Sequence, residues 1–229
     1  MTRKLLIVLV PALLIWGSLS VAQATHKAGH QPGPTPAPTV GGSTITGNES
    51  NDVINGGAGA DTLDGGGGND VLKGGAGIDL LDGGNGNDTL DGDSERDFLS
   101  GGNGNDVLAD DEGSNIFAGG QGDDVLTGGP LSDSLNGGSD EDTLRGGGGN
   151  DGLTGASGDD RLFGDDGNDR IDGGLGKDTI DGGKGGDNIV AFDARVDKIT
   201  CGAGKDVVRA DAGDTVARDC ETVFVTSRR

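Results

Sequence analysis

The 229-residue chain is poor in aromatic side chains, with five Phe, one Trp and no Tyr. It is also poor in large apolar side chains, while glycine is abundant with 50 copies. Such a composition is typical of chains that cannot bury enough apolar surface to fold alone. It also excludes an aromatic platform for binding a sugar ring, which argues against a glycosidase.

Basic residues are scarce as well. The chain has 17 Lys and Arg against 39 Asp and Glu, a formal net charge of -22. Without a basic stripe to neutralise phosphates, nucleic-acid binding is excluded as a function class, and binding to an anionic membrane surface is disfavoured for the same reason. Cations are the natural partners of such a chain.

Catalytic signatures are absent from the sequence. There is no HExxH or GxSxG motif, and the only histidines, His26 and His30, lie in a proline-rich segment. Their spacing would allow a shared metal ion, but no helix is expected there, and we interpret them as exposed linker residues. Outside the repeats described below, no segment is long enough for a catalytic domain. We therefore expect no enzyme activity.

The N-terminal segment has the pattern of a secretory signal peptide. Arg3 and Lys4 precede the apolar run 5–21, and Ala22-Gln23-Ala24 supplies a small-x-small cleavage pattern. The alternative, a retained membrane anchor, is disfavoured because the run is short and contains Pro11. We expect cleavage after residue 24, an extracellular protein with no membrane insertion afterwards, and a Pro-rich linker over residues 25–46.

Residues 47–190 divide into sixteen nonapeptides without insertion or deletion, with the consensus G-G-x-G-x-D-x-U-x, where U is a large apolar residue. Position eight is apolar in every unit. Position six is Asp in all units except the eighth, which has Asn115, and position one is Gly in all except the same unit, which has Asp110. A disordered tether has no reason to keep this register over so long a stretch.

These sixteen units resemble the hemolysin-type (RTX) calcium-binding repeat proteins. The resemblance implies an all-β fold, a right-handed parallel β-roll (a β-solenoid) with six-residue loops and three-residue strands. Two repeats would form one turn, giving about eight turns, with multiple Ca²⁺ ions between stacked loops. Carbonyls and carboxylates are the hard oxygen ligands that calcium prefers, whereas zinc and copper ligands are absent from the repeats.

The carboxylate ligands implied by this resemblance are the position-six aspartates of the regular units. They are Asp52, Asp61, Asp70, Asp79, Asp88, Asp106, Asp124, Asp142, Asp151, Asp160, Asp169, Asp178 and Asp187.

Buried aliphatic side chains, one per nonapeptide, cannot offset the entropy of ordering so many glycines. We therefore expect folding to be coupled to calcium binding, with the calcium-free chain largely disordered.

With two units per turn, odd-numbered units stack along one edge of the roll and even-numbered units along the other. The degenerate loops 92–97, 110–115 and 128–133 belong to units six, eight and ten, all on the even edge. We expect continuous calcium sites on the odd edge and a calcium-poor gap on the even edge. Whether these loops reflect drift or a partner-binding patch stays open.

The remaining residues, 191–229, are expected to form a C-terminal β cap with degenerate repeats, as solenoids require. Ala191 interrupts the register by one residue. Both cysteines, Cys201 and Cys220, lie in this cap. In an exported chain a disulfide is the simplest interpretation, and a redox-active pair is the alternative. The stretch resembles the cysteine-paired tail of secreted calcium-binding repeat proteins from Gram-positive bacteria.

The sequence thus predicts a secreted, monomeric calcium-binding β-roll. The alternative is a calcium-rigidified structural or adhesive element at the cell surface, with the cell wall or another surface protein as its partner. Ice binding is disfavoured because position seven carries no regular Thr or Asn ladder.

Overall fold

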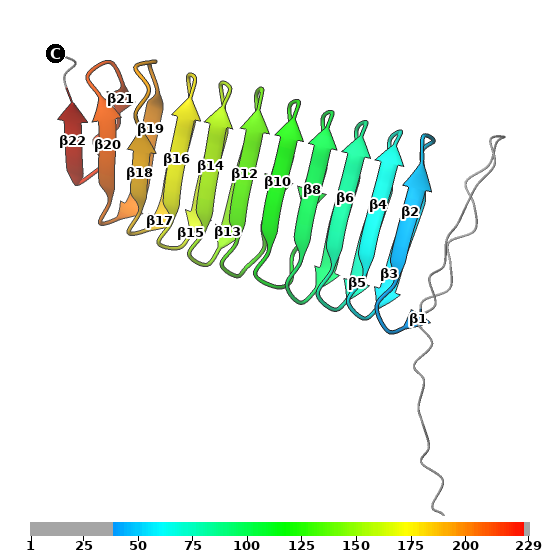
Figure 1. Cartoon of the computed structure of the whole chain (residues 1–229). Helices are drawn as coiled ribbons and strands as arrows, with labels where there is room; N and C mark the ends of the chain where they lie inside the picture. Colours follow the sequence, from blue (N-terminus) through cyan, green and yellow to red (C-terminus); the bar gives the residue numbers. More distant parts are fainter. Residues whose placement is uncertain (1–38, 227–229) are drawn as a thin grey trace, which may run out of the picture.

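The computed structural model describes residues 39–226, which form strands and turns and contain no helix. The strands follow one another along a single elongated body, as Figure 1 shows, and alternate between two parallel sheets of eleven strands each. We call the sheet of the odd-numbered strands sheet A and that of the even-numbered strands sheet B. The predicted signal peptide, residues 1–24, lies outside the described residues.

Sheet A contains β1 (Thr39–Val40), β3 (Val53–Ala58), β5 (Val71–Ala76), β7 (Thr89–Ser94), β9 (Val107–Ala109), β11 (Val125–Thr127), β13 (Thr143–Gly148), β15 (Arg161–Asp166), β17 (Thr179–Gly185), β19 (Lys198–Gly204) and β21 (Thr215–Val216). Sheet B contains β2 (Thr44–Asn48), β4 (Thr62–Gly67), β6 (Leu80–Asn85), β8 (Phe98–Asn103), β10 (Ile116–Gln121), β12 (Ser134–Ser139), β14 (Gly152–Ser157), β16 (Arg170–Leu175), β18 (Asn188–Ala191), β20 (Val207–Asp211) and β22 (Thr222–Thr226).

Each strand pairs in parallel with the strand two places further along the chain. Within the repeats the partners are 18 residues apart, as for Leu72 with Leu90 and Leu81 with Leu99. Two nonapeptides therefore form one turn, and the predicted parallel β-solenoid is confirmed. The prediction of about eight turns is too low, because the solenoid extends beyond the sixteen regular units at both ends.

At the N-terminal end, strands begin inside the range 25–46 that the sequence analysis assigned to a linker. β2 carries Ile45, which lies nine residues before Ile54 and is likewise buried. Ile45 thus occupies position eight of a further unit, whose position four is still glycine, Gly41. This unit does not match the consensus because positions one, two and six are Pro38, Thr39 and Ser43, although its apolar residue keeps the period.

Most strands are six residues long rather than the expected three. They include x-U-x and continue through the first three positions of the next unit, as in β6. Only positions four to six are left to form the turn. Among the strands that lie wholly within the sixteen units, β9 and β11 alone stop after three residues. They precede the degenerate loops 110–115 and 128–133, whose first three positions do not join the sheet.

The core is a double column of position-eight side chains, one column on the inner face of each sheet. Because side chains alternate along a strand, position eight points inward while positions seven and nine point outward. All sixteen position-eight residues are buried, and Ile45, Ile199 and Val208 continue the columns beyond the regular units. Phe117 is the one aromatic residue among the buried side chains of the described chain. The core is thus only two aliphatic side chains wide.

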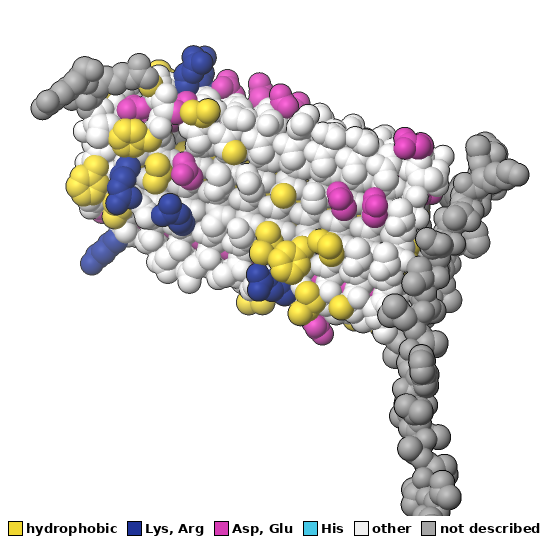
Figure 2. All heavy atoms as spheres, viewed as in Figure 1, with side chains coloured by type: hydrophobic (Ala, Val, Ile, Leu, Met, Phe, Trp, Pro, Cys, Tyr) yellow, Lys and Arg dark blue, Asp and Glu magenta, His cyan; other side chains and the backbone are white. Residues whose placement is uncertain are grey.

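The outer face of sheet B carries an apolar cluster near its middle. Leu80, Phe98 and Ile116 are neighbours on β6, β8 and β10, and Figure 2 shows apolar side chains gathered there beside basic ones. The Leu80 side chain is 49% exposed, and the Arg96 guanidinium lies 5.3 Å from the centre of the Phe98 ring.

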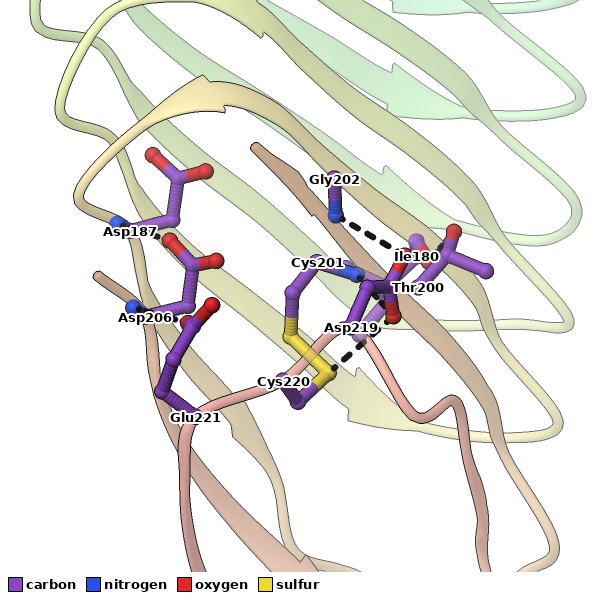
Figure 3. Close-up of a disulfide and its surroundings, with 9 residues drawn as sticks. All are labelled: Ile180, Asp187, Thr200, Cys201, Gly202, Asp206, Asp219, Cys220 and Glu221. Atoms are coloured by element: carbon purple, nitrogen blue, oxygen red, sulfur yellow. Dashed lines mark hydrogen bonds between the residues drawn. A yellow bond between two sulfur atoms is a disulfide. The ribbon is translucent and has the colours of Figure 1, made fainter. Parts of the chain in front are cut away.

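At the C-terminal end the solenoid continues through β19–β22 rather than ending at residue 190. Ile180 pairs with Ile199, 19 residues apart, which confirms a one-residue insertion. Cys201 is fully buried and bonded to Cys220, as Figure 3 shows, so the predicted disulfide is confirmed. Closing a loop of this length stabilises the fold by about 3 kcal/mol in the chain-entropy account.

A truncation in the core column should destabilise the fold strongly. We expect Leu126→Ala to lower the free energy of unfolding in calcium by about 2–5 kcal/mol, because it leaves a cavity in a narrow core. The neighbouring Val125→Ala, at an outward position that is 43% exposed, should cost less than about 1 kcal/mol. Denaturant unfolding of both variants measures this, and equal losses would contradict the assignment of inward and outward positions.

Candidate metal sites

The position-six aspartates form two hydrogen-bonded columns, one along each edge of the solenoid. In each column the Oδ1 atom of one Asp accepts a hydrogen bond from the backbone N–H of the position-six residue 18 residues earlier. The N–H of Asp70, for example, donates to Asp88 Oδ1 at 2.7 Å, and that of Asp106 donates to Asp124 Oδ1 at 2.8 Å. One carboxylate oxygen per nonapeptide thus links each solenoid turn to the next.

The second carboxylate oxygen, Oδ2, is buried and accepts no hydrogen bond in most of these turns. It belongs to the position-six residues Asp61, Asp70, Asp79, Asp88, Asp97, Asp106, Asp124, Asp142, Asp151, Asp160, Asp169, Asp178, Asp187 and Asp206, and the Oδ2 atom of Asp110, at position one of unit eight, is in the same state. Twelve of the thirteen predicted ligands are in this set. The exception is Asp52, whose Oδ2 accepts hydrogen bonds from the backbone and side chain of Asn48.

Backbone carbonyl oxygens converge beside these Oδ2 atoms. A Cβ added to Gly83 would lie 2.5 Å from Asp88 Oδ2 and 2.6 Å from the carbonyl oxygen of Gly101, one solenoid turn further on. The same pair of oxygens recurs at Gly56, where the distances to Asp61 Oδ2 and to the Gly74 carbonyl oxygen are 2.5 and 2.7 Å. A side chain at position one would therefore meet both oxygens. The arrangement fits a hard cation that takes carboxylate and carbonyl ligands together.

Most residues at position four have a left-handed backbone. Gly86 has φ 124° and Gly77 has φ 126°, values that L side chains rarely adopt. In unit six, position four is Glu95, which nevertheless takes φ 79°. The backbone of unit six therefore keeps the left-handed conformation at position four although Glu95 has a Cβ. In unit ten, by contrast, Leu131 does not take a positive φ and the turn departs from the regular shape.

The three degenerate loops of the even edge differ from one another. Asn115 keeps the column, because its Oδ1 accepts the Asp97 N–H at 2.8 Å, but its Nδ2 donates to the Glu112 carbonyl. In unit ten the Oδ2 of Asp133 accepts the N–H of Gly129 at 2.9 Å. The loops of units eight and ten therefore offer no free carboxylate oxygen at position six, whereas that of unit six does. The calcium-poor stretch that we expect on the even edge therefore comprises units eight and ten but not unit six, and it stays a prediction.

Sequence reasoning missed several polar residues that belong to these columns. Asp97 and Asp206 have the same free Oδ2 as the regular units, but the loop of Asp97 has lost two of its glycines, and Asp206 lies in a near-regular unit of the C-terminal cap, outside the sixteen repeats. At the C-terminal end, Asp214 and Glu221 take the place of a further position-six Asp by accepting the N–H groups of Asp197 and Asp206. Figure 3 shows Glu221 below Asp206 in this column. The shortened spacing of these two residues hid them.

A second column runs along the odd edge at position five. The N–H of Asn69 donates to Asn51 Oδ1, and that of Asn87 donates to Asn69 Oδ1, both at 2.9 Å. These side chains are exposed and bond in the opposite direction to the aspartates. The recurrence of Asn at position five in units one, three, five and seven was the available signal. Hydrogen bonds of the same direction also link position five along the even edge from unit ten onward, as from the Asn168 N–H to Asn150 Oδ1.

No group of three or more His, Cys, Asp and Glu residues of the kind that holds a metal ion occurs among residues 39–226. A cation in these turns would therefore depend largely on backbone carbonyls, with few carboxylates per site. The same residues include no helix long and apolar enough to cross a membrane.

Comparison with protein families agrees with this geometry. The model of the RTX calcium-binding nonapeptide repeat matches six overlapping stretches, which together span residues 39–189, well over half of the chain. The stretches are 39–72, 64–99, 100–135, 119–153, 127–162 and 154–189. The chain belongs to the RTX calcium-binding repeat family. A search of the curated proteins found no significant match.

Burial alters the titration of the RTX aspartates in the absence of a cation. Desolvation raises the pKa of Asp106, Asp142 and Asp169 to about 7 and that of Asp70 to about 6, against an ordinary value of 3.8. Neighbouring carboxylates of the same column raise these pKa values further, while the hydrogen bond from the backbone lowers them. At neutral pH a substantial part of the column would be ionised at an energetic cost to the fold.

The calcium-free protein should therefore fold better in mild acid. Because these pKa values are higher in the folded state, that state binds more protons than the unfolded chain between about pH 4 and pH 7, and its stability falls as the pH rises through this window. In chelator, circular dichroism should show strand content increasing from about pH 7 to about pH 5. In saturating calcium the trend should reverse, because protons compete with the cation for the same oxygens. A folded fraction that falls on acidification in chelator would contradict this.

Proposed function

We propose that this chain is an extracellular calcium-binding β-roll without catalytic activity, whose folding is coupled to calcium binding. The observation that carries the proposal is the repeated buried Oδ2 atom that accepts no hydrogen bond. A buried carboxylate oxygen without a partner costs a folded protein free energy. A cation bound beside each one would convert this cost into binding energy.

The composition of the turns favours calcium over other metals. Beside most position-one glycines one carboxylate oxygen and one carbonyl oxygen lie close together, and such ligands suit the tolerant geometry of calcium. Magnesium requires a smaller octahedron, and zinc or copper would favour thiolate or imidazole ligands. The described repeats contain neither group in a free form, since both cysteines form the disulfide. We infer that the twelve aspartates that were predicted as ligands and have a free Oδ2 serve in this role.

Coupling of folding to binding follows from the narrow core. Each nonapeptide contributes one large buried apolar side chain, and the remaining positions are largely glycine and polar residues. Because glycine loses the most entropy on ordering, this core alone is a weak driving force. The columns of buried carboxylates oppose folding until a cation neutralises them. Calcium would supply the missing free energy.

The extracellular location rests on two observations. The disulfide between Cys201 and Cys220 is stable in an oxidising compartment, and the N-terminal 24 residues have the pattern of a signal peptide. The absence of catalysis is proposed because the acidic residues are accounted for by the repeat. Such a protein would bind several calcium ions outside the cell, with the roll as a rigid calcium-loaded element.

A pair of neighbouring substitutions separates ligand loss from charge loss. Asp124→Asn should keep the backbone hydrogen bond through Oδ1, as Asn115 does, but remove the free Oδ2. Asp123→Asn removes the same charge from an exposed position where Asn also occurs in other units. We expect Asp124→Asn to weaken calcium binding at the adjoining sites roughly tenfold or more, and Asp123→Asn to leave it nearly unchanged.

Isothermal calorimetry of calcium binding, paired with circular dichroism, measures this. Equal behaviour of the two variants would contradict the ligand role of Asp124. If the unsubstituted protein bound no calcium at millimolar concentration, or had the same strand content in chelator, the proposed function itself would fail.

The apolar cluster on sheet B favours a second candidate function, a calcium-rigidified adhesive element at the cell surface. The exposed Leu80 and Phe98 and the half-buried Ile116 form a column of larger apolar side chains than the exposed valines on the outer face of sheet A. A rigid sheet with such a column could dock on the cell wall or on a surface protein, with the segment before β1 as a stalk.

If this function holds, the double substitution of Leu80→Ser with Phe98→Ser should abolish calcium-dependent sedimentation with cell walls from the source organism. The matched pair Val53→Ser with Val71→Ser, on the outer face of sheet A, should retain it. Both variants should bind calcium normally. No sedimentation of the unsubstituted protein in calcium, or equal loss in both variants, would exclude the cluster as an attachment surface.

A further inference from the structure

Position one is occupied by glycine in fifteen of the sixteen units, and in the eighth unit it is Asp110. In regular turns the carbonyl oxygen of the position-one glycine lies beside the Oδ2 atom of the preceding turn on the same edge. At Gly83, for example, the two oxygens nearest to an added Cβ are Asp88 Oδ2 and the Gly101 carbonyl oxygen. The regular turn therefore combines one carboxylate with one carbonyl at this point.

At Gly92 the pair of oxygens is different. The two atoms nearest to an added Cβ are the Oδ2 atoms of Asp110 and Asp97, the latter at 2.5 Å. The carboxylate of Asp110 has taken the place that a carbonyl occupies elsewhere. The even edge between units six and eight thus brings together two carboxylates from successive turns where the other turns have one.

Neither carboxylate is neutralised by the surrounding protein. The side chains of Asp97 and Asp110 are buried, 0% and 3% exposed, and neither Oδ2 accepts a hydrogen bond. Their Oδ1 atoms are already used, by the N–H of Asp79 at 2.6 Å and by that of Glu112 at 3.1 Å. The ion pairs found within residues 39–226 involve neither residue. Two buried carboxylates side by side cannot both stay ionised unless a cation lies between them; without one, they share a proton through a hydrogen bond between Asp97 and Asp110.

The backbone of unit six remains suited to a cation, although its sequence is degenerate. Asp93 and Glu95 take φ 68° and 79°, in the region where glycine stands in regular turns, and β7 keeps its full six residues. The next column member, Asn115, directs its amide to the Glu112 carbonyl. The charge missing from position six of unit eight is thus restored at position one of the same unit, facing unit six.

We propose that Asp97 and Asp110 hold a calcium ion in a two-carboxylate site on the even edge, a site that differs in composition from the sites of the regular turns. This inference rests on the proposed calcium binding of the roll. Because calcium affinity rises with the number of charged ligands, this site binds calcium more tightly than the one-carboxylate sites. It also prefers trivalent lanthanides over calcium more strongly, and it lies at the boundary of the calcium-poor units eight and ten.

Three variants of the full-length, disulfide-bonded protein test the site. Asp110→Asn removes the second charge with little change in shape, and Asp110→Gly restores the regular position-one residue. Asp111→Asn removes the same charge from the adjacent exposed position and is the control. Calcium titration by calorimetry, in competition with a chelator, should resolve a tight site whose affinity falls at least about tenfold in both Asp110 variants and stays unchanged in Asp111→Asn.

A structural readout makes the test independent of stability. Crystals grown in calcium and soaked in a substoichiometric amount of terbium should show their strongest anomalous peak between Asp97 and Asp110, and this peak should be lost from Asp110→Gly crystals. Peaks in the regular turns without one at this position would overturn the inference and leave the proposed function intact. Equal calcium affinities of Asp110→Asn and Asp111→Asn would also overturn it. A protein that binds no calcium at all would instead refute the proposed function.

Discussion

The structure depends on the two oxygens of one repeated carboxylate. In each regular turn the Oδ1 atom of the position-six Asp accepts the backbone N–H of the corresponding residue in the preceding turn, as Asp88 does for Asp70. This bond fixes the spacing of the turns at the edges, where no sheet is present. The Oδ2 atom, buried beside a glycine carbonyl, has no such partner. The first oxygen stacks the turns, and the second makes them unstable without a cation.

This division joins stability to calcium binding over the whole length of the roll. The sheets bury only one aliphatic side chain per nonapeptide, so they cannot absorb the cost of a column of ionised carboxylates. Formation of the sheets therefore depends on neutralisation of the carboxylates along the edges. The disulfide at Cys201 acts at the C-terminal end, where the columns finish at Asp214 and Glu221 and the stacking of further turns is lost.

The period of the sequence predicted the parallel solenoid, the inward position eight and the disulfide, because each is expressed in residue types that recur or stand alone. It did not predict strand lengths, since glycine at positions one and two has no side chain to reveal that it lies in a strand. The proposed role of Asp110 as a second carboxylate beside Asp97 could not be predicted either, because position one is glycine in all other units. The direction in which position one points becomes visible only where a side chain replaces glycine, as Asp110 and Cys201 do. Ile45 was missed because its unit has Ser43 in place of the position-six aspartate and no glycine at positions one and two.

Asn115 shows what the fold alone requires of position six. Its amide accepts the Asp97 N–H through Oδ1 as an aspartate would, and both sheets continue past unit eight in unbroken register. Asparagine is therefore sufficient for stacking and avoids the cost of burying a charge. Nevertheless, the other fifteen units carry aspartate. An array built only for shape would gain stability from asparagine at this position, so the repeated buried charge is best explained by a cation that requires it.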